Sequence, residues 1–181
     1  LGIENVLALR GDLPRGDGGA QDGSSFRFAS ELVQFVAQGQ KSGRWSLELG
    51  GACYPEGHLE SGTREEDLAN LVTKVDAGLR FLLTQLFFDN AFYFDFLARA
   101  KAAHIQVPIV PGIMPITNFE QVDRFTRLCG ATIPMKLRLQ LERYQSDAEA
   151  ILELGVAHAT VQCVELLSRG APGIHFYTLN K

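Results

Sequence analysis

The sequence has few cysteines and no pattern that would join them. Cys53, Cys129 and Cys163 lie far apart, and the chain contains no Cys-x-x-Cys pair. An odd number of scattered thiols argues against a disulfide framework and against a cysteine-based metal site. We therefore expect buried free thiols and no metal.

The chain also lacks an excess of basic residues. Its formal net charge is −4 and its isoelectric point is about 5.6, so we do not expect nucleic acid as a partner. We find no apolar run of about 20 residues and no signal peptide. These absences predict a soluble, cytoplasmic protein with no membrane partner, and 181 residues suffice for one domain with a sizeable core.

The common nucleotide-binding fingerprints are missing as well. The Gly/Asp-rich stretch 15–25 has neither the Gly-x-Gly-x-x-Gly nor the Gly-x-x-x-x-Gly-Lys-Ser/Thr spacing. We interpret this stretch as a polar surface loop. Because it follows the first predicted strand, the missing fingerprint counts against a Rossmann domain.

What the chain does have is five strand-like runs that alternate with helical patterns. The strands are expected at about 5–9, 46–54, 81–88, 108–114 and 173–179. Helix caps are expected at Thr63, Asp89 and Asn118, and a C-terminal cap at Gly170. Alternating strands and helices predict an α/β fold with a parallel sheet, arranged as a doubly wound sheet or as a barrel.

Polar side chains follow these strand-like runs. Arg10, Gly11 and Asp12 come after the first run, and Tyr54 and His58 come after the second. Parallel α/β folds build their active sites where the carboxyl ends of the strands meet. For the first group alone, however, a polar surface turn is the simpler interpretation.

Other polar residues allow two interpretations each. Asp67, Asn70 and Lys74 form one stripe on a helix, and their spacing alone favours a solvated face. Gln85 interrupts an apolar run, and a buried amide without a partner would cost about 1–3 kcal/mol, so it has either a protein partner or a ligand. For Gln121 a helix cap is the alternative to a ligand contact, and for Phe125 a core position.

Several strings of residues, taken together, resemble the methylenetetrahydrofolate reductase family of flavin enzymes. The resemblance runs from about residue 4 to the last residue. The strings are Ala8-Leu9-Arg10-Gly11-Asp12-Leu13-Pro14, Tyr54-Pro55-Glu56-Gly57-His58, Lys74-Val75-Asp76-Ala77-Gly78, Thr84-Gln85-Leu86-Phe87-Phe88, Pro111-Gly112-Ile113-Met114-Pro115 with Asn118-Phe119, and His175-Phe176-Tyr177-Thr178-Leu179-Asn180.

The resemblance implies a (β/α)8 TIM barrel with FAD at the carboxyl ends of the strands. It implies that NADH or NADPH reduces FAD, and that the reduced flavin converts 5,10-methylenetetrahydrofolate to 5-methyltetrahydrofolate by a ping-pong mechanism. This reaction belongs to one-carbon metabolism and methionine biosynthesis. The implied partners are the folate substrate, the nicotinamide nucleotide and further copies of the chain in a homo-oligomer.

The resemblance also implies residue roles. Asp12 is the expected catalytic residue, because an anion near the flavin ring tunes its potential. The expected cofactor contacts are Arg10, Gly11, Asp12, Phe28, Ala29, Tyr54, His58, Asp67, Asn70 and Lys74. The expected substrate contacts are Asp12, Gln85, Gln121, Phe125 and Lys181. For the helical stripe, the resemblance reverses the preference for a solvated face.

The sequence departs from the family in two respects. Phe28 stands where Tyr is usual, Thr73 where bacterial members often have Arg, and Lys181 where the motif ends in Arg, which replaces a fork of donors by a point charge. In addition, a barrel of this type needs about 250 residues. We therefore expect a partial domain that contains the fourth to eighth βα units.

The expected partial domain has a functional consequence. The glutamate that the family uses as general acid belongs to the N-terminal units, which are absent from this sequence. The alternative function is therefore a non-catalytic or truncated family member that binds flavin or folate.

Overall fold

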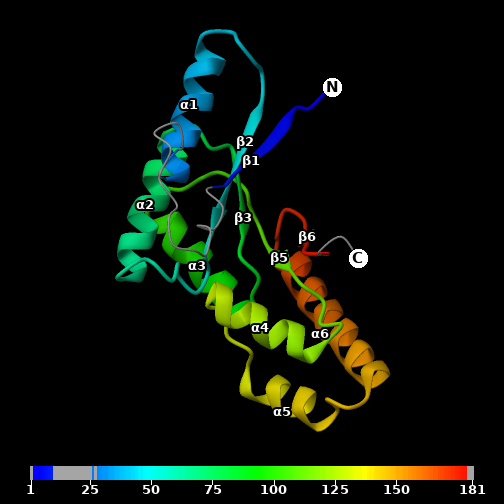
Figure 1. Ribbon diagram of the computed structural model, residues 1–181. Helices are drawn as coiled ribbons and strands as arrows, with labels where there is room; N and C mark the ends of the chain where they lie inside the picture. The colour runs from blue at the N-terminus through cyan, green and yellow to red at the C-terminus, as the bar shows by residue number, and fades with distance from the viewer. Residues whose placement is uncertain (1, 10–25, 27, 179–181) are drawn as a thin grey trace, which may run out of the picture.

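The computed structural model describes residues 2–9, 26 and 28–178 (Figure 1). The predicted α/β class with a parallel sheet is confirmed. In chain order the elements are β1 (Asn5–Ala8), α1 (Ala29–Lys41), β2 (Glu48–Cys53), α2 (Arg64–Asp76), β3 (Phe81–Thr84), α3 (Asn90–Ala102), β4 (Ile109–Val110), β5 (Gly112–Ile113), α4 (Phe119–Cys129), α5 (Met135–Arg143), α6 (Ala148–Ser168) and β6 (His175–Phe176).

The strands form two parallel groups. One is a four-stranded sheet in the order β1-β2-β3-β4, and the other is the pair β5-β6. Within the described residues the sheet is open, so the structure shows the α/β class but not a closed (β/α)8 barrel.

Pro111 divides the strand that we expected at 108–114. The residues before it pair with β3, and the residues after it pair with β6. Proline has no N–H to donate to a strand neighbour, and it is therefore disfavoured inside a sheet. The main-chain oxygen of Pro111 accepts from the N–H of His175 at 3.0 Å, so the chain changes its pairing partner at this residue.

The predicted strand 81–88 is also shorter than expected. Regular pairing ends at Thr84, and the apolar residues that follow it form a buried loop. A buried strand and a buried apolar loop have the same composition, and composition was the basis of the prediction.

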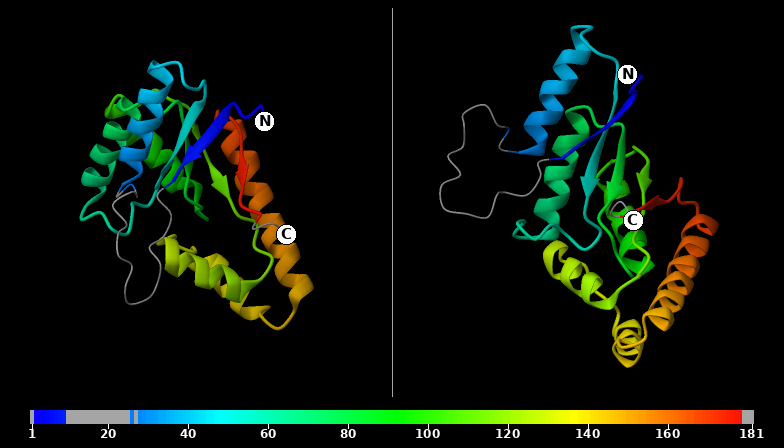
Figure 2. Two further views of the ribbon diagram at one scale, coloured as in Figure 1. Left: turned by 45° about the horizontal axis from the view of Figure 1, so that its top comes forward. Right: turned by 45° about the vertical axis from the view of Figure 1, so that its right-hand side comes forward.

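Helices cover the sheet from one side. In Figures 1 and 2, α1 and α2 lie side by side on one face of the four-stranded sheet, with α3 beyond them, whereas α4, α5 and α6 gather at the end away from α1. One buried cluster joins the sheet to α1, α2 and α3 and includes Leu49, Leu82 and Phe96. A second cluster lies among α4, α5 and α6 and includes Ile116 and Leu141.

Two glycines allow neighbouring side chains to pack onto β2. A Cβ at Gly50 would lie 2.3 Å from the ring of Phe81, and a Cβ at Gly51 would lie 2.4 Å from Leu79. Both glycines are buried. The close packing of these large side chains on the strand therefore depends on glycine at both positions.

The helix caps that were predicted from local sequence are confirmed. Thr63, Asp89 and Asn118 each accept a hydrogen bond from a main-chain N–H in the first turn, at 3.1, 2.9 and 2.8 Å. Gly170 follows α6 in the left-handed region, at φ 90°. These signals act over three or four residues, so they can be recognised without the tertiary structure.

α6 corrects the expectation that the chain has no long apolar segment. With 21 residues it is long and apolar enough to cross a membrane, judged by length and composition alone. It also makes polar contacts within the protein. His158 and Gln162 approach the main-chain oxygens of Phe88 and Phe87 at 3.0 and 3.2 Å.

Candidate functional site

The candidate site lies at the carboxyl edge of the four-stranded sheet. Tyr54 follows β2 and Gln85 follows β3, and the N–H of Gln85 donates to the main-chain oxygen of Cys53 at 2.8 Å. Both residues line a small, partly open space, together with Glu56, Leu86, Cys129 and Ala131 among others. The structure thus brings Tyr54 and Gln85 together, although Gln85 was expected inside the strand 81–88 and not after its end.

The loop after β2 orients His58. Its ring packs edge-on against Tyr54, with the ring centroids 4.5 Å apart. The Nδ1 atom of His58 accepts from the N–H of Glu60 at 3.1 Å. In a neutral imidazole the proton is therefore on Nε2, which leaves that atom as a donor.

The polar stripe on α2 is only partly solvated. Asp67 and Lys74 are half-buried, whereas Asn70 is exposed. The ammonium of Lys74 donates to the main-chain oxygen of Ala52 at 3.3 Å, which directs it to the end of β2. The simple solvated-face interpretation is therefore wrong for Asp67 and Lys74.

Burial and charge act in opposite directions on the pKa values of this pair. Burial lowers the pKa of Lys74, and the charge of Asp67 counteracts that effect. Burial raises the pKa of Asp67, and the charges of Lys74 and His58 counteract that effect. The two groups thus support each other's charged forms in a poorly solvated place.

Cys53 is the buried thiol that was expected. Its Sγ lies 3.6 Å from the main-chain oxygen of Leu83, and burial raises its pKa, so the thiol stays protonated. All three cysteines are free, but Cys129 and Cys163 are only half-buried. The prediction of buried thiols is therefore confirmed for Cys53 alone.

For Gln85 the sequence left two alternatives, a protein partner or a ligand, and the structure shows a protein partner. Its Oε1 accepts from the N–H of the next residue, Leu86, at 2.9 Å. Within the described part of the chain, its amide nitrogen makes no hydrogen bond. Gln85 therefore keeps two N–H donors and one lone pair of Oε1 for a further partner.

α4 carries Gln121 and Phe125. Phe125 packs against the second buried cluster, as the core alternative predicted, and the Arg124 guanidinium lies 5.6 Å from its ring centroid. The main-chain N–H of Gln121 donates to the Asn118 cap. Cys129, at the end of α4, lines the same small space as Gln85.

The remaining predicted residues lie on other segments. Phe28 is the N-cap of α1, and Ala29 is its first residue. The expected flavin contacts Arg10, Gly11 and Asp12, of which Asp12 is also the expected catalytic residue, and the expected substrate contact Lys181 lie outside the described residues.

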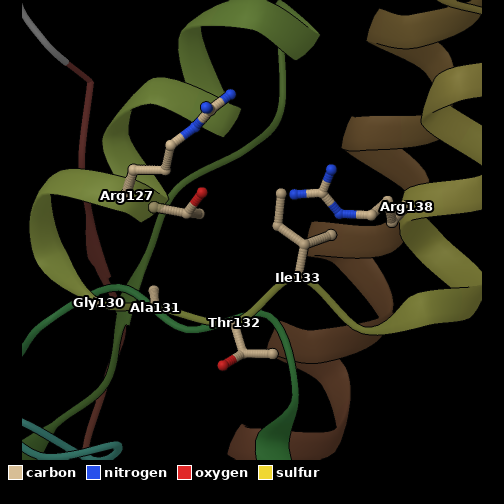
Figure 3. Close-up of a pocket in the computed structure, with 7 residues that line it drawn as sticks. Arg127, Gly130, Ala131, Thr132, Ile133 and Arg138 are labelled. Carbon is tan, nitrogen blue, oxygen red and sulfur yellow. The ribbon is translucent and has the colours of Figure 1, made fainter.

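A larger cavity, wide open to solvent, lies beside the site, between α4 and α5 (Figure 3). Its volume is about 380 Å³, and its lining includes Arg127, Thr132 and Arg138. Both arginines bind the carboxylate of Asp123, and Arg138 also approaches Glu142 at 3.5 Å. Because acids of this chain already neutralise both cations, the cavity has no surplus positive charge for an anion.

Comparison with known proteins identifies the family. The model of the methylenetetrahydrofolate reductase family matches residues 1–181. The chain belongs to this family. It is 38% identical, over 181 residues, to the 5,10-methylenetetrahydrofolate reductases of Salmonella typhimurium and Escherichia coli, covering 99% of this chain and 57% of each relative. The chain thus spans little more than half the length of these reductases.

A further relative and a solved structure are also similar to this chain. A probable methylenetetrahydrofolate reductase (NADPH) from Caenorhabditis elegans is 36% identical over 182 residues, covering 100% of this chain and 27% of that protein. A solved structure is titled "Uncharacterized protein from Clostridium thermocellum binds two copies of 5-methyl-5,6,7,8-tetrahydrofolic acid". It has a TM-score of 0.56 at 19% identity, covers 96% of this chain and 64% of its own, and shows a shared fold.

Sequence reasoning missed the residues that support the site. Arg99 donates to the main-chain oxygen of Pro55 at 3.1 Å, and Glu56 accepts from the N–H of Thr132. Tyr177 donates to the main-chain oxygen of Thr84 at 2.8 Å. Glu56 and Tyr177 stand inside matched family strings, but nothing in one sequence indicates which distant main-chain atom each side chain binds.

Proposed function

We propose that this chain is part of a flavin-dependent reductase. The reaction is the reduction of 5,10-methylenetetrahydrofolate to 5-methyltetrahydrofolate, with NADH or NADPH as electron donor. The match of the family over the whole chain is the observation that carries the proposal. The relatives include a probable NADH enzyme from Oryza sativa and a probable NADPH enzyme from Caenorhabditis elegans, so either donor is compatible with the family.

The proposal extends to the architecture. The chain contributes the fourth to eighth βα units of a (β/α)8 barrel, and the remaining units supply the general acid. Its parallel strands, its open sheet and the greater length of its relatives support this arrangement. We further propose a cytoplasmic homo-oligomer that serves methionine biosynthesis.

The residues around Lys74 suit FAD as the cofactor. After its bond to Ala52, the Lys74 ammonium still has two N–H donors, and a half-buried cation suits a pyrophosphate. The carboxylate of Asp67 and the amide of Asn70 suit ribose hydroxyls and the adenine edge. Bound FAD would supply hydride-transfer chemistry that no side chain possesses.

The side chains of this protein bind and orient the cofactor and the folate. Tyr54 and His58 form one wall of the cofactor site. Gln85 donates from its amide nitrogen to an acceptor on the pterin, while Gln121 and Phe125 hold the folate from α4. Arg10, Gly11 and Asp12 complete the flavin wall, with Asp12 acting at the reacting ring, and Lys181 binds the folate.

The visible absorption of the purified full-length natural protein tests this function. We expect a flavin band that NADH or NADPH bleaches and that 5,10-methylenetetrahydrofolate restores. A protein that takes up no flavin after incubation with FAD would overturn the proposal. Flavin that binds but is never reduced would favour the alternative, a non-catalytic family member that binds flavin or folate.

A further inference from the structure

Glu56 connects two loops that are far apart in the sequence. It lies in the loop after β2, and its Oε1 and Oε2 accept from the main-chain N–H of Thr132 at 3.0 and 3.1 Å. Thr132 belongs to the segment between α4 and α5. A carboxylate that accepts from a main-chain N–H makes a charge-assisted hydrogen bond, roughly twice as strong as one between neutral groups.

The same loop is also held from its other side. Arg99, on α3, donates from Nη2 to the main-chain oxygen of Pro55 at 3.1 Å. Asp95 accepts from Nε of Arg99 at 2.8 Å, which fixes the direction of the guanidinium. The loop that carries Tyr54 and His58 is therefore held by α3 at Pro55 and by the α4–α5 segment at Glu56.

Packing reinforces the connection at Glu56. Leu59 lies against Gly130, where an added Cβ would be 2.6 Å from its Cδ2. Gly130 ends α4 in the left-handed region, at φ 77°. A side chain at position 130 would meet both Leu59 and an unfavourable backbone conformation, so glycine permits this close approach.

The small, partly open space next to Gln85 lies between the two connected segments. Tyr54 and Glu56 line it from one side, and Cys129 and Ala131 line it from the other. The width of this space therefore depends on how closely the loop after β2 approaches the end of α4. The Glu56–Thr132 hydrogen bonds join these two segments directly.

We propose that Glu56 is a positioning residue that couples the cofactor side of the site to the substrate side. By holding the N–H of Thr132, it sets the position of α4, with Gln121 and Phe125, relative to Tyr54 and His58. The expected effect of Glu56 on catalysis rests on the proposed function. The connection that Glu56 makes between the two loops does not depend on it.

Hydrogen exchange of the Thr132 amide tests the connection by itself. In the full-length protein, we expect this amide to exchange roughly ten-fold faster in Glu56→Ala than in the wild type. Glu56→Gln keeps one acceptor oxygen and should give intermediate exchange. Glu153→Ala removes an exposed acid of α6 and is the matched control for charge. Unchanged exchange in Glu56→Ala would overturn the proposal.

Ligand binding tests the coupling. We expect Glu56→Ala to raise both the Kd for FAD and the KM for the folate, each roughly ten-fold, because both sides of the site lose their relative position. Thr132→Pro removes the donor from the opposite segment and should reproduce both effects, whereas Thr132→Ala keeps the N–H and the connection. If Thr132→Pro does not fold, the Glu56 variants decide the outcome.

The possible outcomes separate the two proposals. Faster exchange with a change in FAD affinity alone would overturn the coupling, because the substrate side would then be independent of Glu56. A wild-type protein that binds neither FAD nor folate would overturn the proposed function, and the exchange result would still decide whether Glu56 holds the two loops together.

Discussion

The hydroxyl of Tyr177 donates to the main-chain oxygen of Thr84 at 2.8 Å, and it thereby joins the end of β3 to the segment after β6. The side chain of Thr84 makes a second connection, because its Oγ1 accepts from the N–H of Gly112 at 2.8 Å. β3 belongs to the four-stranded sheet, whereas β5 and β6 form the separate pair. Thr84, which precedes Gln85, is therefore one point where the two groups of strands are joined by hydrogen bonds.

Removing the Tyr177 hydroxyl should loosen this junction. Burial raises the pKa of Tyr177 to about 12, so the hydroxyl keeps its proton and donates at neutral pH. We expect Tyr177→Phe to lower the free energy of unfolding by about 1–3 kcal/mol, because the Thr84 oxygen loses a donor. Urea denaturation measures the change. Tyr144→Phe, at an exposed tyrosine, is the control, and equal effects of the two substitutions would contradict the prediction.

Gly155 should not tolerate even a methyl group. A Cβ at this position of α6 would lie 1.8 Å from the main-chain oxygen of Ile116. The backbone must move to relieve that contact, so Gly155→Ala should destabilise the protein by about 1–3 kcal/mol. Gly173→Ala adds the same methyl group in open space and should change stability little. Thermal unfolding of the two variants compares them, and a stable Gly155→Ala protein would show that α6 can shift.

His158 should make stability depend on pH. Burial lowers its pKa in the folded protein, while the contact with the Phe88 oxygen partly counteracts burial. Between this lowered pKa and the unfolded value of about 6.5, the unfolded chain binds more protons. The contribution of His158 to stability is therefore fully present above the unfolded pKa, and it is lost as the pH falls towards the lower pKa of the folded protein. Denaturation at several pH values should show this slope, and His158→Gln should reduce it. An unchanged slope in that variant would assign the effect to other groups.

Lys74 should contribute its charge to cofactor binding. Lys74→Met keeps much of the apolar stem but removes the ammonium, so we expect the Kd for FAD to rise about ten-fold or more in the full-length protein. Lys101→Met, on the exposed side of α3, is the matched control. Titration of the flavin-free protein with FAD, followed by fluorescence, measures both. Equal affinity for FAD in Lys74→Met and in the wild type would show that Lys74 does not contribute to cofactor binding.

Local signals determined which parts of the structure could be predicted. Thr63, Asp89 and Asn118 cap helices through atoms two or three residues away, and all three were predicted. The division of a strand at Pro111 was missed, because it depends on which neighbour each half finds.

The supporting contacts of the site were beyond prediction for a similar reason. Glu56 binds a main-chain N–H that is 76 residues away in the sequence, and Tyr177 binds a main-chain oxygen 93 residues away. A main-chain N–H or oxygen is present at nearly every residue, so the type of residue at the far end gives no signal. The grouping of Tyr54 with Gln85 came from the family resemblance, because Gln85 was expected inside the strand 81–88, whereas β3 ends at Thr84.

The glycine pair in β2 limits how this sequence can diverge. Phe81 and Leu79 occupy the space that side chains at Gly50 and Gly51 would need. A larger residue at Gly50 requires Phe81 to move or to become smaller, and a larger residue at Gly51 requires the same of Leu79. Among distant descendants, we therefore expect correlated substitutions between β2 and these two residues at or just before the start of β3.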